Sequence, residues 1–300
     1  MLPGNGANLN RKQNPDLNPS LTRHTFSDWC RNPNRETLVM GILNVTPDSF
    51  SDGGQFFSVE AAIEHGQSFI NDGADIIDIG GESTRPGADP LSIEDELERV
   101  IPVIKSIRKD HNDILISIDT YKSEVAQQAI EAGADIVNDV SGFVMDPKMP
   151  TAIANFNAFV ILMHMKGKPT NMQENPSYDD LIVDISSFLL YQINIAKTTG
   201  IPTDKIILDP GIGFGKTAAH NFTIIQKLNR FCELGFPIMI GPSRKSFIGT
   251  TLDLPPSERI EGTAAAVSAG ILNGARIVRV HDVKEMKRVV AITEKIRTAA

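Results

Sequence analysis

Three polar side chains stand at the ends of separate apolar runs, and their types suit the binding of one flat ligand. Asp119 ends the run ILISID, Asn138 follows the Ile-Val pair in GADIVNDVSG, and Asp209 ends the run IILD. Two carboxylates and an amide match a heterocycle that offers several N–H donors, such as the guanidine-like edge of a pyrimidinone. For each residue taken alone, structural hydrogen bonding to a neighbouring strand is the alternative.

Lys245 brings a cationic group to the same ligand if the apolar run before it is also a strand. It follows Ser243 and Arg244 in GPSRKSFIG, and we interpret it as a donor to a ligand carbonyl or ring nitrogen. A lysine that forms an imine with the substrate is the rival chemical role. A solvated surface lysine is the structural alternative, because lysines are rarely buried.

A second group of polar residues suits an anion and a metal ion. Arg279 and His281 lie two apart in the last apolar run, and so on one side of a strand, whereas Asn44 follows the first run. Such donors beside an amide oxygen suit a diphosphate with Mg²⁺, because this ion prefers oxygen ligands and usually keeps waters and phosphates. Alone, His281 would more often be an ordinary polar residue, and its spacing from Arg279 strengthens the interpretation.

The elements that must bring these residues together recur along the chain. The segments GADIIDIGG (73–81), GADIVNDVSG (133–142) and GARIVRVHD (274–282) each combine a Gly-Ala helix exit, a strand and polar residues. Runs of this kind are typical of parallel strands covered on both faces. We predict eight strands, at residues 39–43, 76–79, 114–118, 136–137, 159–163, 206–208, 237–240 and 277–280. The chain is therefore predicted to be an α/β protein with a (β/α)8 TIM barrel, whose strands direct the polar residues to one rim.

Helical segments separate the predicted strands. Apolar residues at helical spacing predict helices near residues 59–71, 93–107, 123–131, 178–197, 224–234, 257–272 and 283–297. Gly200 is expected to end the fourth of these helices as its C-terminal cap. Pro102 predicts a bend in the second.

Length and composition limit the classes of protein that fit the sequence. The chain has 300 residues, and one barrel needs roughly 250, so we expect residues 23–300 to form a single barrel domain. Residues 1–22 are rich in Asn and Pro, and we expect a mobile N-terminal extension without chemistry, with a tag or transit peptide as the alternative. A formal net charge of −8 argues against nucleic-acid or membrane binding.

The cysteines and the apolar runs favour a cytoplasmic location. Cys30 and Cys232 provide no disulfide framework, which favours a reducing compartment. No apolar run approaches the length of a membrane span, and the N-terminus lacks the apolar core of a signal peptide. We therefore expect a cytoplasmic protein.

Two motifs with other chemistry do not fit. GIGFGKT resembles a P-loop, but Pro210 stands where the pattern G-x-x-x-x-G-K-[ST] requires glycine. The histidines show no H-E-x-x-H spacing, and the two cysteines are far apart, so a zinc site is not expected.

Seven motifs in order resemble the dihydropteroate synthase family. They are NVTPDSFSDGG, GGESTRPGA, SIDTYK, NDVSG, LDPGIGFGK, GPSRKSFIG and RVHD, and the match spans residues 38 to about 296. Several long motifs in the right order are more specific than any one of them. The resemblance implies transfer of a 7,8-dihydropterin-6-ylmethyl group from its diphosphate to the amine of 4-aminobenzoate. The products would be 7,8-dihydropteroate and diphosphate, for folate biosynthesis.

The resemblance also implies roles for individual residues, with Asp119, Asp209 and Lys245 as the catalytic ones. The positions that hold the pterin are Asp119, Asn138, Asp209 and Lys245. The positions that bind Mg²⁺ are Asn44 and Asp52, and those that hold the diphosphate are Thr84, Arg85, Arg279 and His281. The aminobenzoate pocket is shaped by Phe50, Pro86 and Ser243, with Met163 and Phe214 near the rings. A homodimer and a target for sulfonamides are further implications.

Three other functions stay open at this point. A pterin-binding methyltransferase barrel shares the heterocycle pocket but passes a methyl group to a corrinoid, and the chain lacks a corrinoid-binding segment and has both polar loops, at 44–54 and 80–87. An aldolase-type barrel would use Lys245 to form an imine. A non-catalytic barrel would bind pterin without releasing diphosphate.

Overall fold

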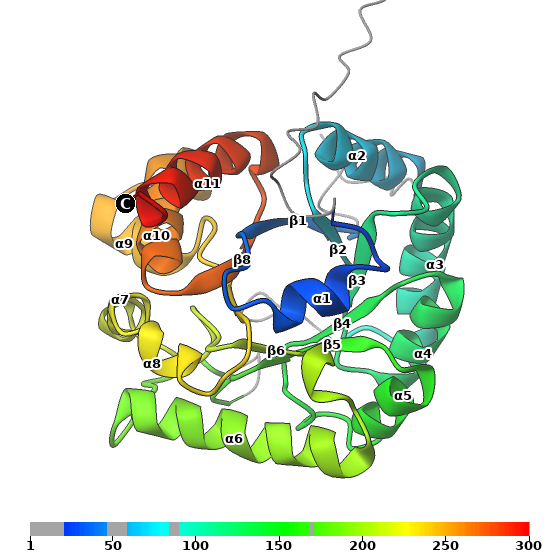
Figure 1. Cartoon of the computed structure of the whole chain (residues 1–300), viewed down its shortest axis with the longest axis horizontal. Coiled ribbons are helices and arrows are strands. Elements are labelled where there is room, and N and C mark those ends of the chain that lie inside the picture. The colour runs from blue at the N-terminus through cyan, green and yellow to red at the C-terminus, as the bar shows by residue number, and fades with distance from the viewer. Residues whose placement is uncertain (1–20, 47–58, 84–89, 168–170, 300) are drawn as a thin grey trace, which may run out of the picture.

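Eight parallel strands close into a barrel in the order of the chain, from β1 round to β8 (Figure 1). The structure is a computed structural model, and it describes residues 21–46, 59–83, 90–167 and 171–299. The strands are β1 (Leu38–Asn44), β2 (Ile76–Gly80), β3 (Leu115–Asp119), β4 (Ile136–Asp139), β5 (Phe159–Met163), β6 (Ile206–Asp209), β7 (Ile238–Ile240) and β8 (Ala275–Val280). All eight predicted strands are present, so the predicted (β/α)8 barrel is confirmed.

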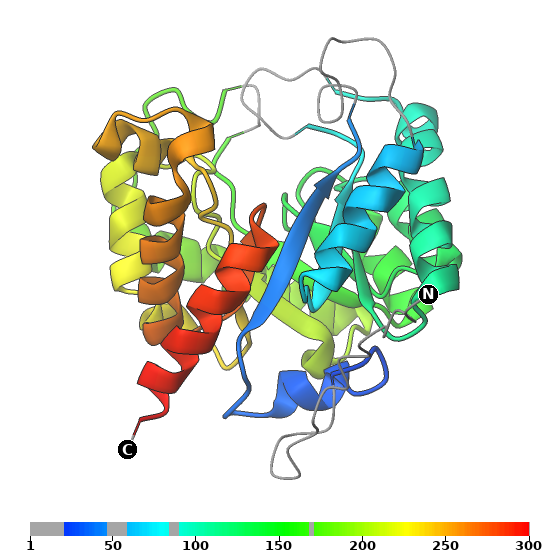
Figure 2. The same ribbon diagram turned by 90° about the horizontal axis from the view of Figure 1, so that it is seen from above.

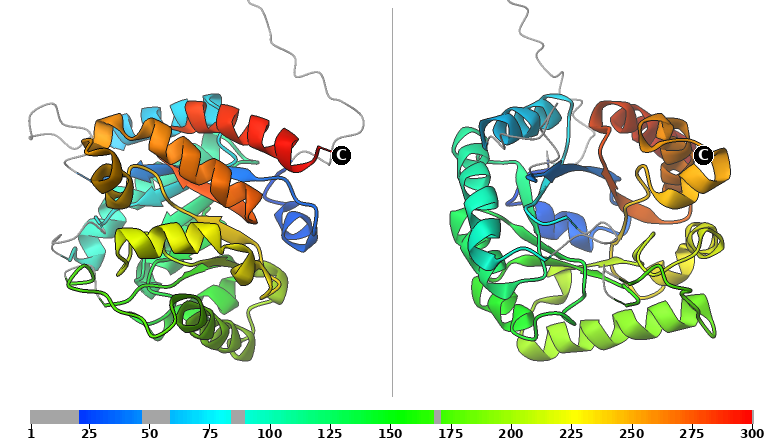
Figure 3. Two further views of the ribbon diagram at one scale, coloured as in Figure 1. Left: turned by 90° about the vertical axis from the view of Figure 1, so that its left-hand side faces the viewer. Right: turned by 180° about the vertical axis from the view of Figure 1, so that it is seen from behind.

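Helices surround the barrel on its outer side, as the two side views and the view from behind show (Figures 2 and 3). Five of them match the predictions closely: α2 (Val59–Asn71), α3 (Ile93–Asp110), α4 (Ser123–Ala132), α6 (Leu181–Thr199) and α11 (Val283–Arg297). Gly200 caps α6 in the left-handed conformation, as predicted. Helix α3 runs through Pro102 as one helix.

Two predicted helices are wrong in their extent. The predicted helix at 224–234 is two helices, α7 (Ala218–Gln226) and α8 (Asn229–Cys232). Helix α7 begins early because the Thr217 hydroxyl accepts a hydrogen bond from the His220 amide, 3.2 Å away, and so caps it. The predicted helix at 257–272 is a 3₁₀ turn, η3 (Pro256–Glu258), followed by α10 (Ile260–Leu272).

Other short helices were not predicted, because their apolar patterns are too short to indicate helix. They are α1 (Phe26–Arg31), α5 (Met149–Phe156) and α9 (Ser246–Leu252), and η2 (Thr203–Lys205) is a further 3₁₀ turn. Helix α1 lies across the end of the barrel where the strands begin (Figure 2). Its Phe26 ring packs 4.7 Å from the ring of Phe159, measured between centroids, and so closes that end with apolar surface.

Alternate residues of each strand face the inside and the outside of the barrel. The outward residues Val39, Ile77 and Ile116 belong to the large core between strands and helices. The inward residues Met40 and Ile76 belong to a separate cluster that also contains Phe26. We call the end of the barrel where the strands begin the lower end and the end where they finish the upper end. The lower half of the barrel interior is therefore a packed apolar core, as in other TIM barrels.

The N-terminal prediction falls mostly outside the described residues, which begin at Leu21. Leu21 packs against the inner cluster, and the Thr22 amide donates to the Thr25 hydroxyl at 2.9 Å. Because residues 1–20 lie outside the described residues, the extension at 1–22 stays a prediction. Within the described part of the chain, none of the helices is both long and apolar enough to cross a membrane.

Candidate active site

The inward-facing row of the strands changes from apolar to polar toward their C-terminal ends. On four strands, the residue two positions after an inward isoleucine is polar or charged, and β3 also ends with a charged residue. The four isoleucines are Ile76, Ile136, Ile207 and Ile277. These inward polar residues are Asp78, Asp119, Asn138, Asp209 and Arg279. Because side chains alternate along a strand, the same parity that fills the lower core directs these groups into the mouth of the barrel.

Arg279 joins two carboxylates across the mouth. Its Nε donates to Asp78 Oδ2 and its terminal nitrogen donates to Asp119 Oδ2, each at 2.6 Å. Asp78 has no exposed surface, and the Asp119 side chain is 10% exposed. Burial alone disfavours the charge on Arg279, but the two carboxylates outweigh that effect and raise its pKa. The guanidinium therefore stays charged and fixed in place.

Several buried oxygens at the mouth have no hydrogen-bond donor within the described part of the chain. They are Oδ1 of Asp78, Oδ1 of Asp119 and Oδ1 of Asn138. Buried acceptors normally have a partner, and leaving one unpaired costs about 1–3 kcal/mol. Three such acceptors on neighbouring strands indicate a site for a ligand that brings its own N–H donors.

Asp209 and Lys245 form the opposite side of the mouth. Asp209 accepts a hydrogen bond from the Gly211 amide at 2.7 Å, and Met163 is its strand neighbour in register. Lys245 Nζ donates to the Ile212 carbonyl and lies 4.6 Å from the centroid of the Phe214 ring. The structure thus brings together the predicted pterin residues and the predicted ring neighbours.

Lys245 and Arg279 approach each other over a glycine. A Cβ atom on Gly241 would lie 3.8 Å from Lys245 Nζ and 3.7 Å from Arg279 Cβ. A larger residue there would fill the space between the two cations. Gly241 therefore leaves room at the centre of the mouth.

Burial shifts the protonation of the groups in the mouth. It raises the pKa of Asp119 to about 7, although Arg279 opposes the shift, and it raises the pKa of Asp209, although Lys245 opposes it. Burial also lowers the pKa of Lys245 to about 8, with Asp209 opposing. Each of these groups therefore titrates closer to neutral pH than usual, which is typical of functional sites.

Ser243 and His281 form a separate pair at the ends of β7 and β8. The Ser243 hydroxyl oxygen lies 3.0 Å from His281 Nδ1. It also accepts a hydrogen bond from the His281 backbone amide at 3.2 Å. Next to them, Arg244 forms an ion pair with Asp282 and adopts a positive φ of 57°. The structure therefore places His281 beside the predicted aminobenzoate residue Ser243, while Arg279 lies among the carboxylates.

The predicted metal site is only partly described. Asn44 is half-buried at the end of β1, which pairs with both β2 and β8. Among the described residues, no cluster of three or more His, Cys, Asp or Glu side chains could hold a metal ion. One amide oxygen still suits Mg²⁺, which commonly takes one or two protein ligands and completes its shell with waters and phosphate oxygens.

Five predicted site residues lie outside the described residues. They are Phe50, Asp52, Thr84, Arg85 and Pro86. Their predicted roles in metal, diphosphate and aminobenzoate binding stay predictions.

Comparisons with known proteins agree with this arrangement. Residues 40–281 match the family described as pterin binding enzyme. The dihydropteroate synthase of Synechocystis sp. is 49% identical over 279 residues, which cover 93% of this chain and 95% of that protein. The chain belongs to the dihydropteroate synthase family.

Solved structures of the same family have the same fold. A Yersinia pestis dihydropteroate synthase in complex with a sulfonamide drug has a TM-score of 0.84 and 44% identity, and the match covers 88% of this chain and 95% of that one. A Xanthomonas albilineans dihydropteroate synthase in complex with 7,8-dihydropteroate has a TM-score of 0.80 and 37% identity, with 90% and 97% covered. These relatives decide against the corrinoid methyltransferase and the aldolase as alternatives.

The turn after β6 contains a buried lysine, Lys216, that is not among the predicted site residues. Lys216 is 3% exposed, and its Nζ lies 3.0 Å from His164 Nδ1 and donates to the Phe214 carbonyl at 2.9 Å. Burial lowers the pKa of Lys216 well below its usual value, and burial and this lysine lower that of His164 to about 3. The pair ties the turn after β6 to the end of β5, so the lysine of the rejected P-loop motif has internal partners.

The same turn depends on a glycine in the left-handed region. Gly211 has φ +72°, and a Cβ atom there would lie 1.9 Å from the His164 carbonyl oxygen. Only glycine allows the two segments to approach so closely. Part of the DPGIGFGK motif of this chain is therefore a requirement of backbone packing.

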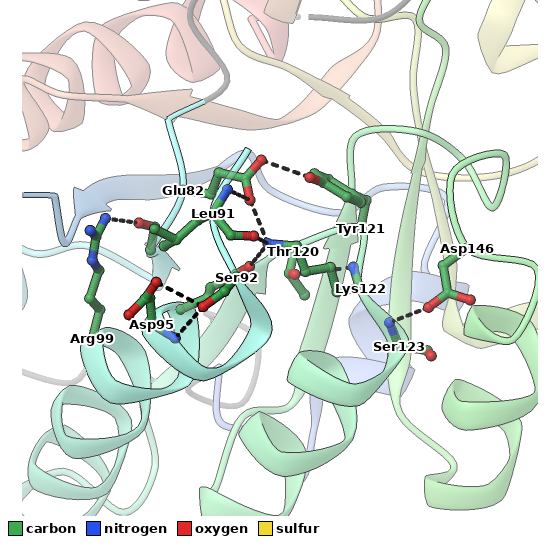
Figure 4. A network of polar contacts seen from close by, with 12 residues as sticks. Glu82, Leu91, Ser92, Asp95, Arg99, Thr120, Tyr121, Lys122, Ser123 and Asp146 are labelled. Atoms are coloured by element: carbon green, nitrogen blue, oxygen red, sulfur yellow. Dashed lines mark hydrogen bonds and ion pairs between the residues drawn. The ribbon is translucent and has the colours of Figure 1, made fainter. Parts of the chain in front are cut away.

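A polar network fixes the described residues on either side of 84–89 (Figure 4). Lys122 Nζ donates to Glu82 Oε2 at 2.5 Å, to the Leu91 carbonyl at 2.8 Å and to Glu96 Oε2 at 2.6 Å. The Tyr121 hydroxyl donates to the second Glu82 oxygen at 2.8 Å. Residues 82 and 91 are thereby attached to the segment that directly follows Asp119, a link that only the tertiary structure reveals.

Proposed function

We propose that the chain condenses (7,8-dihydropterin-6-yl)methyl diphosphate with 4-aminobenzoate to give 7,8-dihydropteroate and diphosphate. The observation that carries the proposal is the group of buried acceptors at the ends of β2, β3 and β4, beside Asp209 and Lys245, which find no donor among the residues that the structure describes. Family membership supplies the reaction, and the dihydropteroate complex of the Xanthomonas albilineans relative supports the product.

The pterin is held by groups of complementary type. Asp119 Oδ1 and Asn138 Oδ1 accept from the N–H donors of the aminopyrimidinone edge, and Asp209 accepts on the other side of the mouth. Lys245 turns from the Ile212 carbonyl to a carbonyl or ring nitrogen of the pterin. Met163 and Phe214 border the rings.

The reaction forms a C–N bond and breaks a C–O bond. The aminobenzoate nitrogen bonds to the pterin methylene carbon, the diphosphate leaves with the C–O electron pair, and the new amine loses a proton. Positive charge spreads over the pterin as the C–O bond breaks, and the fixed carboxylates Asp119 and Asp209 stabilise it. About 1.4 kcal/mol of such differential stabilisation gives a tenfold faster reaction.

The aminobenzoate is expected beside Ser243, with Phe50 and Pro86 as further predicted contacts. The diphosphate is expected at His281, Thr84 and Arg85. Arg279 already pairs with two carboxylates, so an anion would share it with them. Ser243 Oγ and His281 Nδ1 are 3.0 Å apart, which supports neighbouring positions for the diphosphate and the aminobenzoate.

Mg²⁺ is proposed to bind through Asn44 and Asp52, with diphosphate oxygens and waters completing its shell. When bound, it would neutralise charge on the departing diphosphate. Removal of divalent ions with EDTA should weaken binding of the diphosphate substrate and leave binding of a pterin without diphosphate unchanged. Equal weakening of both ligands would contradict the assignment.

A homodimer is proposed at the face formed by α7, α9 and α10. An apolar pocket of about 420 Å³ lies there, and Phe222 and Leu252, which are each 46% exposed, line it. Exposed apolar patches of this kind are typical of interaction surfaces. Analytical ultracentrifugation should show a dimer, and Leu252→Glu should shift the protein to monomer; a wild-type monomer at micromolar concentration would contradict the proposal.

A cytoplasmic location is inferred from the two cysteines, both of which are free thiols.

The test of the proposed reaction is release of diphosphate by the purified protein. Release that requires both the pterin diphosphate and 4-aminobenzoate is expected, and a sulfonamide should compete with 4-aminobenzoate. Pterin binding without release would favour a non-catalytic barrel. Trapping of a keto substrate on Lys245 by borohydride would contradict the role assigned to Lys245 as a hydrogen-bond donor.

A further inference from the structure

Asp78 is a fully buried carboxylate that the proposed reaction does not yet use. It lies on β2, two residues after the inward Ile76, and has no exposed surface. Its Oδ2 accepts from Arg279 Nε at 2.6 Å and from Asn138 Nδ2 at 3.2 Å. It therefore contacts two residues of the predicted site from one oxygen atom.

The contact with Asn138 decides which way that amide faces. An ionised carboxylate only accepts hydrogen bonds, so the NH₂ group of Asn138 must be the one that faces Asp78. The Asn138 oxygen is then directed elsewhere, and it is one of the buried acceptors without a donor in the described part of the chain. Asp78 thus keeps an acceptor available for the ligand.

The contact with Arg279 decides how much negative charge remains at the mouth. Arg279 alone with Asp119 would form a neutral pair, whereas Arg279 shared by Asp78 and Asp119 leaves one net negative charge when both carboxylates are ionised. A developing cation on the ligand is stabilised by a net charge of this sign in a buried site. A neutral pair would offer much less.

We propose that Asp78 is a positioning residue that shares Arg279 with Asp119 and so keeps one uncompensated carboxylate charge, and the oriented Asn138 oxygen, at the ligand site. The inference rests on the proposed function, since it assigns the retained charge to the cationic pterin. Asp78 acts through Asp119, Arg279 and Asn138.

The titration of Asp119 reports on this arrangement. Burial is the largest cause of its raised pKa, Arg279 opposes the shift, and Asp78 adds to it. The other charged groups that act on Asp119 come from helix α3, from β4 and from the residue that precedes α9, and they are Glu96, Asp139 and Lys245. Removing the Asp78 charge takes away a repulsion and leaves Arg279 to Asp119, so both effects lower the pKa of Asp119.

The experiment compares the pH dependence of kcat/KM for the pterin diphosphate in wild type and Asp78→Asn. In the variant, the acid limb should move down by about one pH unit or more, and kcat/KM at pH 8 should fall about tenfold. The matched control is Asp75→Asn, because Asp75 precedes the same strand at its lower end and pairs with Lys287 there. This control should keep the wild-type acid limb.

An unmoved acid limb in Asp78→Asn, with or without lost activity, would overturn the proposal. If Asp78→Asn does not fold, Asp78→Ser is the second variant, because the smaller side chain fits the same space, and the same downward shift is required of it. Wild-type turnover is measured first. Its absence would count against the proposed function, whereas normal wild-type turnover with an unmoved limb counts against the role of Asp78 alone.

Discussion

The two ends of the barrel use the same strands for different purposes. At the lower end, the inward row carries Met40 and Ile76, and α1 closes it with Phe26. At the upper end, the same row carries Asp78 and Arg279, which are held by ion pairs. Two residues along a strand therefore separate groups that stabilise the fold from groups that suit chemistry.

The difference implies that the ends respond differently to substitution. The lower end excludes water by packing, so a lost side chain costs free energy of unfolding. The upper end keeps buried acceptors that have no donor within residues 21–46, 59–83, 90–167 and 171–299, and carboxylates with raised pKa values. Both features disfavour the folded state without a ligand. Stability should therefore be lost at one end and activity at the other.

Phe26→Ala should disrupt the packing at the lower end of the barrel and have the largest effect on stability. Phe26 is fully buried between Trp29 and Phe159, and the loss should be about 3–5 kcal/mol in the free energy of unfolding. Chemical denaturation measures this, and kcat/KM at low temperature should stay within about twofold of wild type. A large loss of kcat/KM in a folded variant would show that the two ends are not separable.

Asp209→Asn should impair pterin binding and turnover at the upper end of the barrel. The amide keeps the shape but loses the negative charge beside the pterin, and we expect kcat/KM to fall about 10²-fold or more and pterin affinity to fall as well. The matched control is Asp204→Asn, since Asp204 lies at the lower end, where it binds Ser27 and Arg31 of α1. Intact turnover by Asp209→Asn would falsify the pterin role of this residue.

The pH profile sharpens the comparison further. Binding needs Asp119 ionised, which is lost as the pH falls through its pKa of about 7, and Lys245 protonated, which is lost as the pH rises through its pKa of about 8. A plot of kcat/KM against pH should therefore be bell-shaped, falling about tenfold per pH unit on each side. A flat profile from pH 5 to 9 is incompatible with both assignments.

Deletion of residues 1–20 should have the smallest effect. These residues are polar and rich in Asn and Pro, and no motif of the site lies among them. Turnover and melting temperature of the shortened protein should equal those of the full chain. A large loss of turnover would assign a function to the segment.

Much of this arrangement is predictable from the sequence, because apolar runs and side-chain alternation are local properties. They predict the eight strands and place Asp119, Asn138 and Asp209 at strand ends. The same parity, counted two residues on from Ile76, indicates Asp78, although only the structure shows its partner Arg279, 201 positions away. A pairing over that distance leaves no mark on any single segment.

Other features depend on tertiary contacts in the same way. Helix α1 spans Phe26–Arg31, a pattern too short to predict helix, and it is held by packing against Phe159. Lys216 and His164 meet only because β5 and β6 are neighbours and Gly211 lets their exits approach. The motif that contains Lys216 was visible in the sequence, but its internal role was not.

The most direct test of the proposed pterin site is a crystal structure of the protein with a bound pterin. The N–H donors of the aminopyrimidinone edge should lie within about 3.2 Å of Asp119 Oδ1 and Asn138 Oδ1, with Asp209 on the opposite side of the ring. A pterin bound outside the ring of strand ends, with those two oxygens still lacking donors, would contradict it.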